Sequence, residues 1–431
     1  MAGLRSVDHG SGPPPVRSWA AAAKVYGDRR VLSLLFLGFS SGLPFGVLAE
    51  PLTAWLAESQ VSKTMIGLFA LVGLPYSLKF LWAPLMDRLP LPVLTRRFGR
   101  RRGWALFTQA ALLAVVLGLG LTDPRADLWW TAALALAVAF ASASQDIVID
   151  AWRRESLADH EQGFAASLYV NGYRLGMLLS GGGALILADY AGFRTVYVSA
   201  AVLMLSGALL TLAAAEPALS QRPPASLREA VLAPFGEFLA RPRWGVILLF
   251  IVAYKLGDAV AGQMTTPFYL DLGFSKSEIG AVVKLFGLWA TLIGALIGGT
   301  LLLRLRLESA LWGFGILQAL STASFVALVH WGAWLPGLAL VVTFENVSAG
   351  MGTAAFAAFM AMRTNRRFTA TQYALLSSLM GVPRVVLAAP SGWLAEILGW
   401  PVFFFCCAAL AVPGLLLIRR LPAHSGQGVL Q

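Results

Sequence analysis

Two acidic side chains lie in an apolar stretch that is long enough to cross a bilayer. Asp146 and Asp150 are four residues apart, so a helix places both carboxyl groups on one face. A carboxylate in hydrocarbon is unfavourable by about 2.5 to 3.5 kcal/mol on insertion scales, so this face must turn towards partners or a wet cavity. Asp146 is the deeper residue and the better candidate for a proton-coupling group. Asp150 is a second candidate, but an ion pair with Arg153, three residues away, explains it equally well.

Other charged residues lie deep in other apolar stretches. Lys255 and Asp258 are three apart, hence adjacent on one helical face, and lie near the middle of their stretch. Arg174 and Arg384 are similarly deep, and their guanidinium groups have the fork geometry that binds anions. Ionisable residues at this depth mark functional sites by default, although a mutually satisfied structural pair is the alternative.

Two further polar groups lie together in the outer third of another stretch. Glu345 and Asn346 are either partners of the buried cations or part of a cavity rim, and the sequence leaves both open. Lys79 and Lys284 lie closer to the ends of their stretches. Long lysine side chains near a helix end can extend to the interface, and we expect this of both.

The composition identifies the class of protein. Of the 431 residues, 58% are hydrophobic and 13% are charged, whereas about a quarter of the residues in soluble domains are charged. We therefore expect a polytopic membrane protein embedded in a lipid bilayer. A helix needs about 20 residues to span the bilayer. Twelve apolar stretches are close to this length, near residues 31–56, 64–86, 103–121, 128–151, 163–188, 193–214, 245–270, 277–303, 309–330, 334–362, 369–394 and 400–418.

The twelve stretches form two related sets of six. Ser62–Gly67 before the second stretch resembles Ser275–Gly280 before the eighth, which indicates a duplication. Because six is even, both sets start on the same side of the membrane, as in the major facilitator architecture. We expect an all-α membrane protein with a disordered cytoplasmic tail, an N-terminal six-helix bundle, a cytoplasmic linker, a C-terminal six-helix bundle and a second tail, at residues 1–30, 31–215, 216–244, 245–420 and 421–431.

The formal net charge of +11 has two explanations, nucleic-acid binding and membrane topology. With both termini on the cytoplasmic side, 24 of the 33 Lys and Arg residues lie in cytoplasmic segments and four lie in external loops. Cytoplasmic loops of membrane proteins carry such an excess, so the charge is a topology signal. We expect no nucleic-acid partner.

The loop after the second stretch contains a gate-like pattern. Ala83–Arg88 and the arginines that follow it resemble the acidic and basic cytoplasmic gate motif of major facilitators. An interfacial carboxylate such as Asp87 can cap or pair with a neighbouring helix in one state and release it in another. A solvated basic loop is the alternative, and it is our expectation for the individual arginines. The candidates for the gate are Asp87, Arg88 and Arg153.

No pattern typical of an enzyme occurs in the sequence. The four histidines lie in tails or loops, and the chain lacks metal-ligand spacing, a nucleophile elbow and a phosphate loop. We expect no enzymatic activity, no metal and no cofactor. Without a nucleotide site, transport is either passive or driven by an ion gradient.

Seven segments spread over the chain resemble the AmpG muropeptide permeases: Ser41–Pro44, Lys79–Trp82, Ser142–Val148, Gly172–Met177, Tyr254–Ala259, Phe344–Asn346 with Gly350–Thr353, and Ala370–Ser377. The resemblance implies a proton-coupled importer in the bacterial inner membrane. Its substrates would be N-acetylglucosaminyl-1,6-anhydro-N-acetylmuramyl peptides, wall fragments that are recycled and that signal β-lactamase induction. The resemblance also implies functional importance for Gln145, Asp146, Lys255, Asp258 and the segment Phe344–Asn346.

A muropeptide combines neutral sugars with peptide carboxylates. The buried cations would bind the acids: Lys255, Arg174 and Arg384. Amides and aromatic rings would bind the sugars: Gln109, Gln145, Tyr173, Trp82 and Tyr254. We hypothesise that an external proton on Asp146 or Asp258 frees a cation to bind substrate. Loss of that proton to the cytoplasm would then restore the ion pair and release the substrate.

Two other functions remain open. Acetyl-coenzyme A carriers are distantly similar, so a carrier of another acidic metabolite is one alternative. A membrane sensor or assembly factor that uses the same fold without transport is the other. In each case we expect a monomer.

Overall fold

The computed structural model describes residues 29–217, 226–275, 278–381, 383, 387–388 and 390–422. Within these ranges every regular element is a helix of the α, 3-10 or π type. Arg384 lies outside the described residues, as do most of the predicted tails and part of the predicted linker. Arg29 and Arg30, which were expected in the first tail, already belong to the first described helix.

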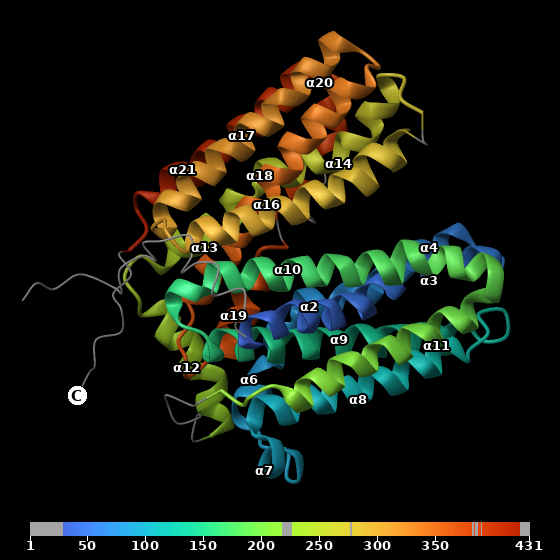
Figure 1. Cartoon of the computed structure of the whole chain (residues 1–431), viewed down its shortest axis with the longest axis vertical. Helices are drawn as coiled ribbons and strands as arrows, with labels where there is room; N and C mark the ends of the chain where they lie inside the picture. Colours follow the sequence, from blue (N-terminus) through green and yellow to red (C-terminus); the bar gives the residue numbers. More distant parts are fainter. Residues whose placement is uncertain are drawn as a thin grey trace, which may run out of the picture.

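The first group of helices runs up to residue 213. Its elements are α2 (Arg29–Leu48), α3 (Glu50–Glu58), α4 (Lys63–Leu68), η1 (Phe69–Gly73), α5 (Leu74–Leu78), η2 (Lys79–Leu81), α6 (Ala83–Arg88), α7 (Leu94–Phe98), α8 (Arg100–Gly120), α9 (Leu128–Ser156), η3 (Asp159–Glu161), α10 (Gln162–Leu178), η4 (Leu179–Gly183) and α11 (Ala184–Ala213). In Figure 1 they form the lower group, from blue to green.

The second group follows the linker. Its elements are α12 (Leu227–Leu239), α13 (Trp244–Tyr254), α14 (Leu256–Asp271), η5 (Ile279–Phe286), α16 (Gly287–Leu302), α17 (Leu307–Trp331), α18 (Leu335–Met362), α19 (Thr369–Leu379), α20 (Ser391–Ala409) and α21 (Ala411–Ile418). Most of them form the upper group in Figure 1, whereas α12 and α19 lie beside the lower group. We call the two groups the N-half and the C-half.

Nine helices of the described residues are long and apolar enough to cross a membrane. One of them, Gln162–Ala213, bends at Gly192, where φ is +73°. Gly399 has φ +68° and bends α20 in the same way. Only glycine adopts this left-handed conformation at no steric cost, so each of these helices consists of two straight parts.

The predicted second span is not a continuous helix. Residues 63–88 form five short helical pieces, α4, η1, α5, η2 and α6. Pro75 and Pro84 lie in the first turns of α5 and α6. Proline has no backbone N–H and clashes with the preceding turn, so a helix readily restarts at such a residue. The apolar run in the sequence does not reveal these breaks, although its prolines do.

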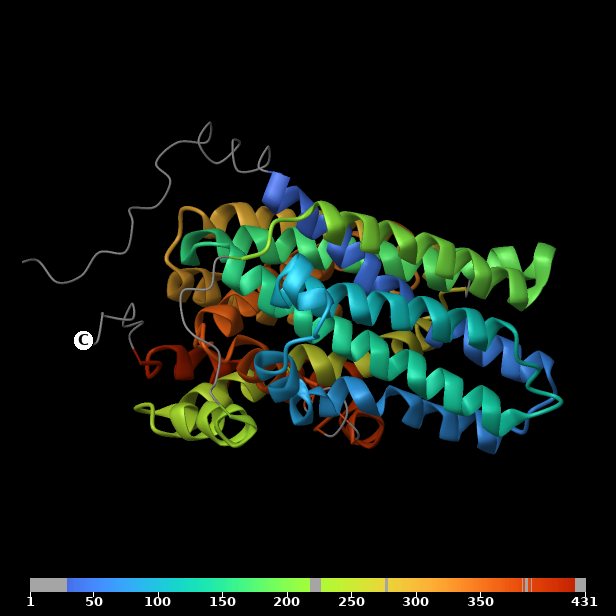
Figure 2. The same cartoon turned by 90° about the horizontal axis from the view of Figure 1, so that it is seen from below.

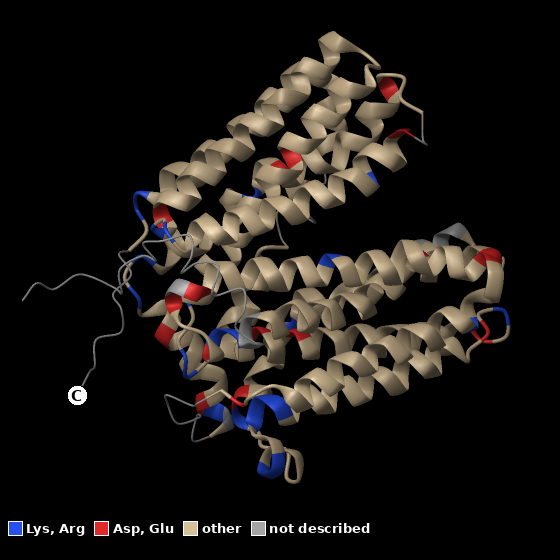
Figure 3. Cartoon of the chain, viewed as in Figure 1, with Lys and Arg blue, Asp and Glu red and all other residues tan. Residues whose placement is uncertain are grey.

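Positive charge collects at one end of the molecule. Figures 1 and 2 show that α2 begins and α21 ends at the same end. Most of the described Lys and Arg residues lie there, while the long helices carry few charges (Figure 3). We call this the basic end. The two halves also contact each other here, because α19 packs against α6 and α9.

A second contact between the halves joins α10 to α16 and α18. Nδ2 of Asn171 on α10 donates to the carbonyl oxygen of Leu292 on α16, at 3.0 Å. Asn171 is buried, so its amide needs this partner.

Within the N-half, α2 and α10 touch backbone to backbone. A Cβ added at Gly42 would lie 2.0 Å from the carbonyl oxygen of Tyr173, and one at Gly172 would lie 1.8 Å from that of Leu35. No side chain fits at either position. Such small residues allow membrane helices to approach closely, and here they bring Ser41 of α2 to the polar face of α9.

Replacing Gly172 with alanine should therefore destabilise the protein, because the added methyl group forces α2 and α10 apart. We expect a loss of about 1–3 kcal/mol, as for other overpacked sites, visible as a lower apparent Tm in detergent. Gly262→Ala on α14 is the matched control, since no heavy atom lies within 4 Å of its added carbon. Equal shifts in the two variants would contradict a close α2–α10 contact.

Candidate functional site

The first charged cluster lies on α9, whose residues 141–154 are all buried. Oδ1 of Asp150 lies 3.5 Å from Nη2 of Arg153, the pair that the spacing predicts. Oδ2 of Asp150 lies 4.0 Å from Nζ of Lys79. The expectation that Lys79 extends to the interface is wrong, because its side chain turns inwards and is 8% exposed. Asp150 therefore has two cationic neighbours.

Asp146 lies one turn before Asp150 on the same buried face. Its charged neighbours are Lys79 and Asp150, and the hydroxyl groups of Ser41 and Tyr169 also lie close to its carboxyl group. Its Oδ1 is buried without a hydrogen-bond partner among the described residues. Since buried polar atoms are nearly always hydrogen bonded, this oxygen has room for a proton or a ligand group.

Two predicted sugar-binding residues lie beside Asp146. Nε2 of Gln145 donates to Oγ of Ser41 at 3.2 Å, so this amide already binds within the N-half. Tyr173 of α10 lies in an aromatic cluster, with ring centroids 6.1 Å from Phe45 and 6.4 Å from Tyr169. The structure thus brings Tyr173 and Gln145 together with Asp146.

The second charged cluster lies in the C-half. Nζ of Lys255 lies 3.0 Å from Oδ2 of Asp258, as the spacing predicts, and both side chains are partly exposed. Lys255 has φ −107° and ψ 7° and occupies the break between α13 and α14. Asp258 lies in the first turn of α14, where the helix dipole favours an anion. The ion pair therefore bridges a discontinuous helix.

Glu345 and Asn346 of α18 turn in different directions. Oε2 of Glu345 lies 2.7 Å from Oγ of Ser321 on α17, and its charged neighbours are Asp258 and Lys255. Asn346 instead accepts a hydrogen bond of 2.7 Å from the Thr291 hydroxyl group on α16. Glu345 thus belongs to the Lys255 cluster, in agreement with the alternative that it is a partner of the buried cations. Asn346 connects two helices of the C-half.

Asp87 of α6 connects the two halves at the basic end. Its carboxylate accepts hydrogen bonds from the backbone N–H groups of Ala370 and Thr371, at 3.3 and 2.9 Å, and from the Thr371 hydroxyl group at 2.8 Å. Asp87 therefore caps the N-terminus of α19, where free N–H groups and the helix dipole favour an anion. Nη2 of Arg101 also binds it, at 2.8 Å.

The expectation that the arginines after Asp87 are solvated is wrong for Arg101. This side chain is fully buried, and its Nε and Nη2 donate to the Glu155 carboxylate at 3.0 and 2.5 Å. Arg100 donates to the backbone carbonyl of Asp87. Arg88, the last residue of α6, is half-buried next to Asp87. Arginine is suited to such sites because its planar group binds two partners at once.

Arg153 makes a further contact between the halves. Its Nη2 donates to the hydroxyl group of Tyr373 on α19 at 2.8 Å. Its guanidinium carbon lies 5.3 Å from the ring centroid of Tyr373 and 5.7 Å from that of Tyr169. Two of the three gate candidates, Asp87 and Arg153, thus contact the same helix of the opposite half.

Two predicted cation sites are less constrained. Arg174 lies in α10 and is partly buried, and its guanidinium group has no ion-pair partner among the described residues. Such a group is available for an anion. Arg384 lies outside the described residues, so its role stays a prediction.

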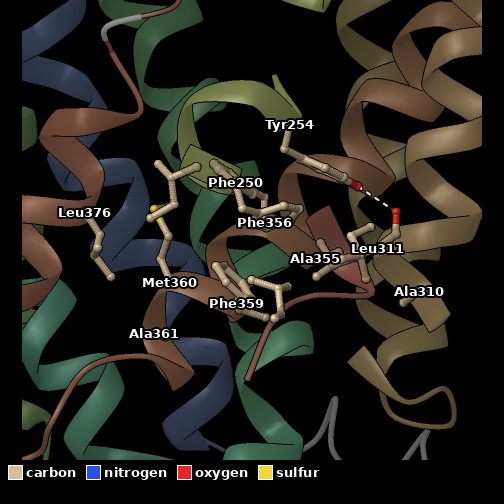
Figure 4. Packing of buried hydrophobic residues seen from close by; sticks show 14 of the residues in the cluster. Phe250, Tyr254, Ala310, Leu311, Ala355, Phe356, Phe359, Met360, Ala361 and Leu376 are labelled. Carbon is tan, nitrogen blue, oxygen red and sulfur yellow. Dashed lines mark hydrogen bonds between the residues drawn. The ribbon is translucent and has the colours of Figure 1, made fainter. Parts of the chain in front are cut away.

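Gln109 and Tyr254, which we predicted to bind sugars, are both hydrogen bonded within their own halves, and their role in binding stays a prediction. Gln109 is 4% exposed, and its Nε2 donates to Oγ1 of Thr211 at 3.0 Å, between α8 and α11. Tyr254 donates to the carbonyl oxygen of Leu311 at 3.0 Å and stacks on Phe356 in the hydrophobic core of the C-half (Figure 4). Tyr254 thus has its hydroxyl group satisfied, whereas Oε1 of Gln109 is buried without a hydrogen-bond partner among the described residues.

Trp82 also lies away from the charged clusters. Its ring stacks on Phe140 with centroids 4.6 Å apart, and its Nε1 donates to Oγ of Ser144 at 3.0 Å. It lines an apolar groove of about 200 Å³ between α6, α8 and α9. Neighbouring Leu85 and Phe107 are exposed, so this groove opens on an apolar surface, and the predicted role of Trp82 in sugar binding stays a prediction.

Several residues of the clusters were not found from the sequence: Ser41, Glu155, Ser321, Thr371 and Tyr373. Three of them lie in segments that resemble the permeases, Ser41, Thr371 and Tyr373. Their position in these segments is the sequence feature that could have indicated them. Their partners are distant in the sequence, so no local spacing indicates the contacts.

The sequence has clear relatives. A model of the Major Facilitator Superfamily matches residues 31–386. The anhydromuropeptide permease of Escherichia coli (strain K12) is 46% identical over 397 residues, which is 92% of this chain and 80% of that protein. The putative transporter AmpG 4 of Rickettsia felis is 33% identical over 405 residues, 92% of this chain and 98% of that protein.

Solved structures share the fold. The human organic anion transporter MFSD10 (TETRAN) has a TM-score of 0.69 at 17% identity and covers 90% of this chain and 99% of its own. The proton:xylose symporter XylE has a TM-score of 0.64 at 12% identity, with coverages of 91% and 94%. The chain therefore belongs to the major facilitator superfamily and, within it, to the family of AmpG-type anhydromuropeptide permeases.

Proposed function

We propose that this protein imports anhydromuropeptides from the periplasm into the cytoplasm, driven by protons, for the recycling of wall fragments. The single observation that carries the substrate is the 46% identity to a protein named anhydromuropeptide permease over 92% of this chain. A role in β-lactamase induction would follow from the same substrate. The chain is a multi-pass protein of the bacterial inner membrane.

The topology that we propose has twelve spans and cytoplasmic termini. The nine long apolar helices, two of them divided by the bends at Gly192 and Gly399, together with the broken segment 63–88, support this count. The basic end would be the cytoplasmic side, because Lys and Arg collect there (Figure 3). Each half would be one six-helix bundle.

The charged groups fit a substrate that carries peptide carboxylates. Lys255 and Arg174 are cations that an acidic group could bind, and Tyr173 offers a ring and a hydroxyl group for a sugar. The two charged clusters lie in opposite halves, so a substrate between the halves could contact both. Major facilitators bind their substrates in this position and expose it to the two sides by rocking of the halves.

The coupling that we propose runs through Asp146. An external proton would neutralise Asp146, so that Lys79 would pair with Asp150 alone. Release of the proton to the cytoplasm would restore the charge of Asp146. Asp150 is a weaker candidate, because Arg153 and Lys79 already stabilise its charge. Asp258 is likewise paired with Lys255.

The gate that we propose consists of Asp87, Arg101 and α19. Capping of α19 by Asp87 holds the halves together at the basic end, which supports a state closed to the cytoplasm. An inward-open state would have to break these hydrogen bonds. They are strong because the Asp87 carboxylate that accepts them is charged, but each can break and form again.

The transport test uses purified protein in proteoliposomes and labelled anhydromuropeptide. An inward proton gradient should drive accumulation, and a protonophore should abolish it. Counterflow with excess unlabelled muropeptide should exceed counterflow with acetyl-coenzyme A. The reverse preference would assign another acidic metabolite, and binding without any flux would indicate a sensor or assembly factor.

Asp146→Asn should separate coupling from substrate movement. The amide keeps the shape of a protonated carboxyl group but cannot release a proton, so accumulation in a proton gradient should fall at least tenfold while counterflow continues. Asp189→Asn is the matched control, since Asp189 is an exposed acid at the far end of the N-half. Full accumulation by the Asp146 variant would refute this proton site.

Asp87→Asn should weaken the closed gate. The substitution breaks a buried ion pair with Arg101, a change that typically costs about 3–5 kcal/mol. In a variant with Cys406 and Cys407 replaced by serine, an impermeant maleimide should label A374C from the basic end faster once Asp87 is changed. Ala374 is buried on α19 at the contact between the halves. Glu161→Gln, at the same end, should leave the labelling rate unchanged.

A further inference from the structure

Glu345, a carboxyl group of the C-half, lacks a cation of its own among the described residues. Glu345 and Asp258 both lie beside Lys255, and Nζ of Lys255 is 3.0 Å from Asp258. Two further described cations lie on elements that pack against α18, Lys284 of η5 and Arg174 of α10, but neither forms an ion pair with Glu345. Two acids thus share one ammonium group, which is already paired.

Two described polar neighbours of Glu345 are neutral. They are Ser321 of α17, at 2.7 Å, and Tyr269 of α14. If Glu345 were ionised, the described cluster of Lys255, Asp258 and Glu345 would carry one uncompensated negative charge, and its side chains are only partly exposed. A carboxylate with little access to water and no cation of its own is unfavourable, and a bound proton removes its charge.

The hydrogen bonds of Ser321 point to the same proton. Its Oγ lies 2.9 Å from the carbonyl oxygen of Gln318 and 2.7 Å from Oε2 of Glu345. A hydroxyl group has one proton to donate, and a carbonyl oxygen can only accept. Both contacts are full hydrogen bonds at once when Ser321 donates to Gln318 and a protonated Glu345 donates to Ser321. An ionised Glu345 would compete with Gln318 for one proton.

The N-half provides the comparison. There Asp150 has two cations, Lys79 and Arg153, so its charge is balanced even with Asp146 ionised. The C-half has the same number of acids in its cluster and one cation fewer among the described residues. The excess acid in the C-half is Glu345.

We propose that Glu345 is a second proton-binding site, which holds its proton while Lys255 is paired with Asp258 and loses it to water when Lys255 turns to Glu345. This inference rests on the proposed function, since it adds a second proton to the same transport cycle. Lys255 remains an ammonium group throughout, and Asp258 remains ionised.

The position of Lys255 connects this exchange to helix movement. Lys255 occupies the break between α13 and α14, whereas Asp258 belongs to α14 and Glu345 to α18. A change of partner by Lys255 therefore changes which helix the end of α13 is bound to. The protonation of Glu345 would in this way favour one bend of the broken helix over the other.

Infrared spectroscopy of the purified protein in water and in heavy water tests the proton directly. At neutral pH the wild type should show the C=O stretching band of protonated carboxyl groups. Glu345→Gln should lower the intensity of this band by the contribution of one carboxyl group. Glu396→Gln, which changes an exposed acid on α20, should leave the band unchanged. An unchanged band in Glu345→Gln would overturn the proposal.

Asp258→Asn tests the competition for Lys255. This variant leaves Glu345 in place but frees Lys255 to pair with it, so the same share of the band should disappear. Retention of the whole band would show that Lys255 does not control the proton, and would overturn that part of the proposal.

The proton-to-substrate ratio tests the role in transport. It is measured in proteoliposomes from the membrane potential at which net muropeptide flux stops, and Glu345→Gln should lower it by one. An unchanged ratio would refute the second site while leaving the proposed function intact. A wild-type protein that moves no muropeptide would refute the proposed function, and the infrared result would still decide whether Glu345 holds a proton.

Discussion

A charged group between apolar helices must have a partner, and this constraint determines how the two halves of the protein are built. Water cannot stabilise the charge there, so each buried ion is retained by an opposite charge or by hydrogen bonds. Asp150 has Lys79 and Arg153, Asp258 has Lys255, and Asp87 has Arg101 with the first turn of α19. The helices that carry these groups can change position only if the partners change as well.

The halves meet through packed apolar residues, such as Met86 with Ala374, and through polar contacts, which the same constraint explains. A hydrophobic contact between the halves would gain little in a bilayer, because lipid tails are as apolar as leucine. Asp87 with Thr371, Arg153 with Tyr373 and Asn171 with Leu292 instead use directional hydrogen bonds. Such bonds hold one arrangement firmly and lose their strength over a short displacement. They are suited to contacts that must open during a transport cycle.

The sequence was informative where partners lie within one turn of a helix. Arg153 with Asp150 and Lys255 with Asp258 follow from spacing alone, and hydropathy located most of the long helices. Lys79 with Asp150 and Arg101 with Glu155 join distant segments, and these contacts depend on which face each helix turns inwards. Apolar residues surround a membrane helix on every side, so its sequence does not show that face. The hydrogen-bond partners of Gln109, Tyr254 and Trp82 could not be predicted for this reason.

The two halves differ in how their charged clusters are balanced. Among the described residues, the N-half places two cations around its acids and the C-half places one. Each cluster also lies at a different kind of backbone. The N-half acids lie on the continuous helix α9, and the Lys255 pair lies across the break between α13 and α14. A change of charge in the N-half therefore affects a continuous helix. A change of charge in the C-half affects the point at which α13 and α14 can bend relative to each other.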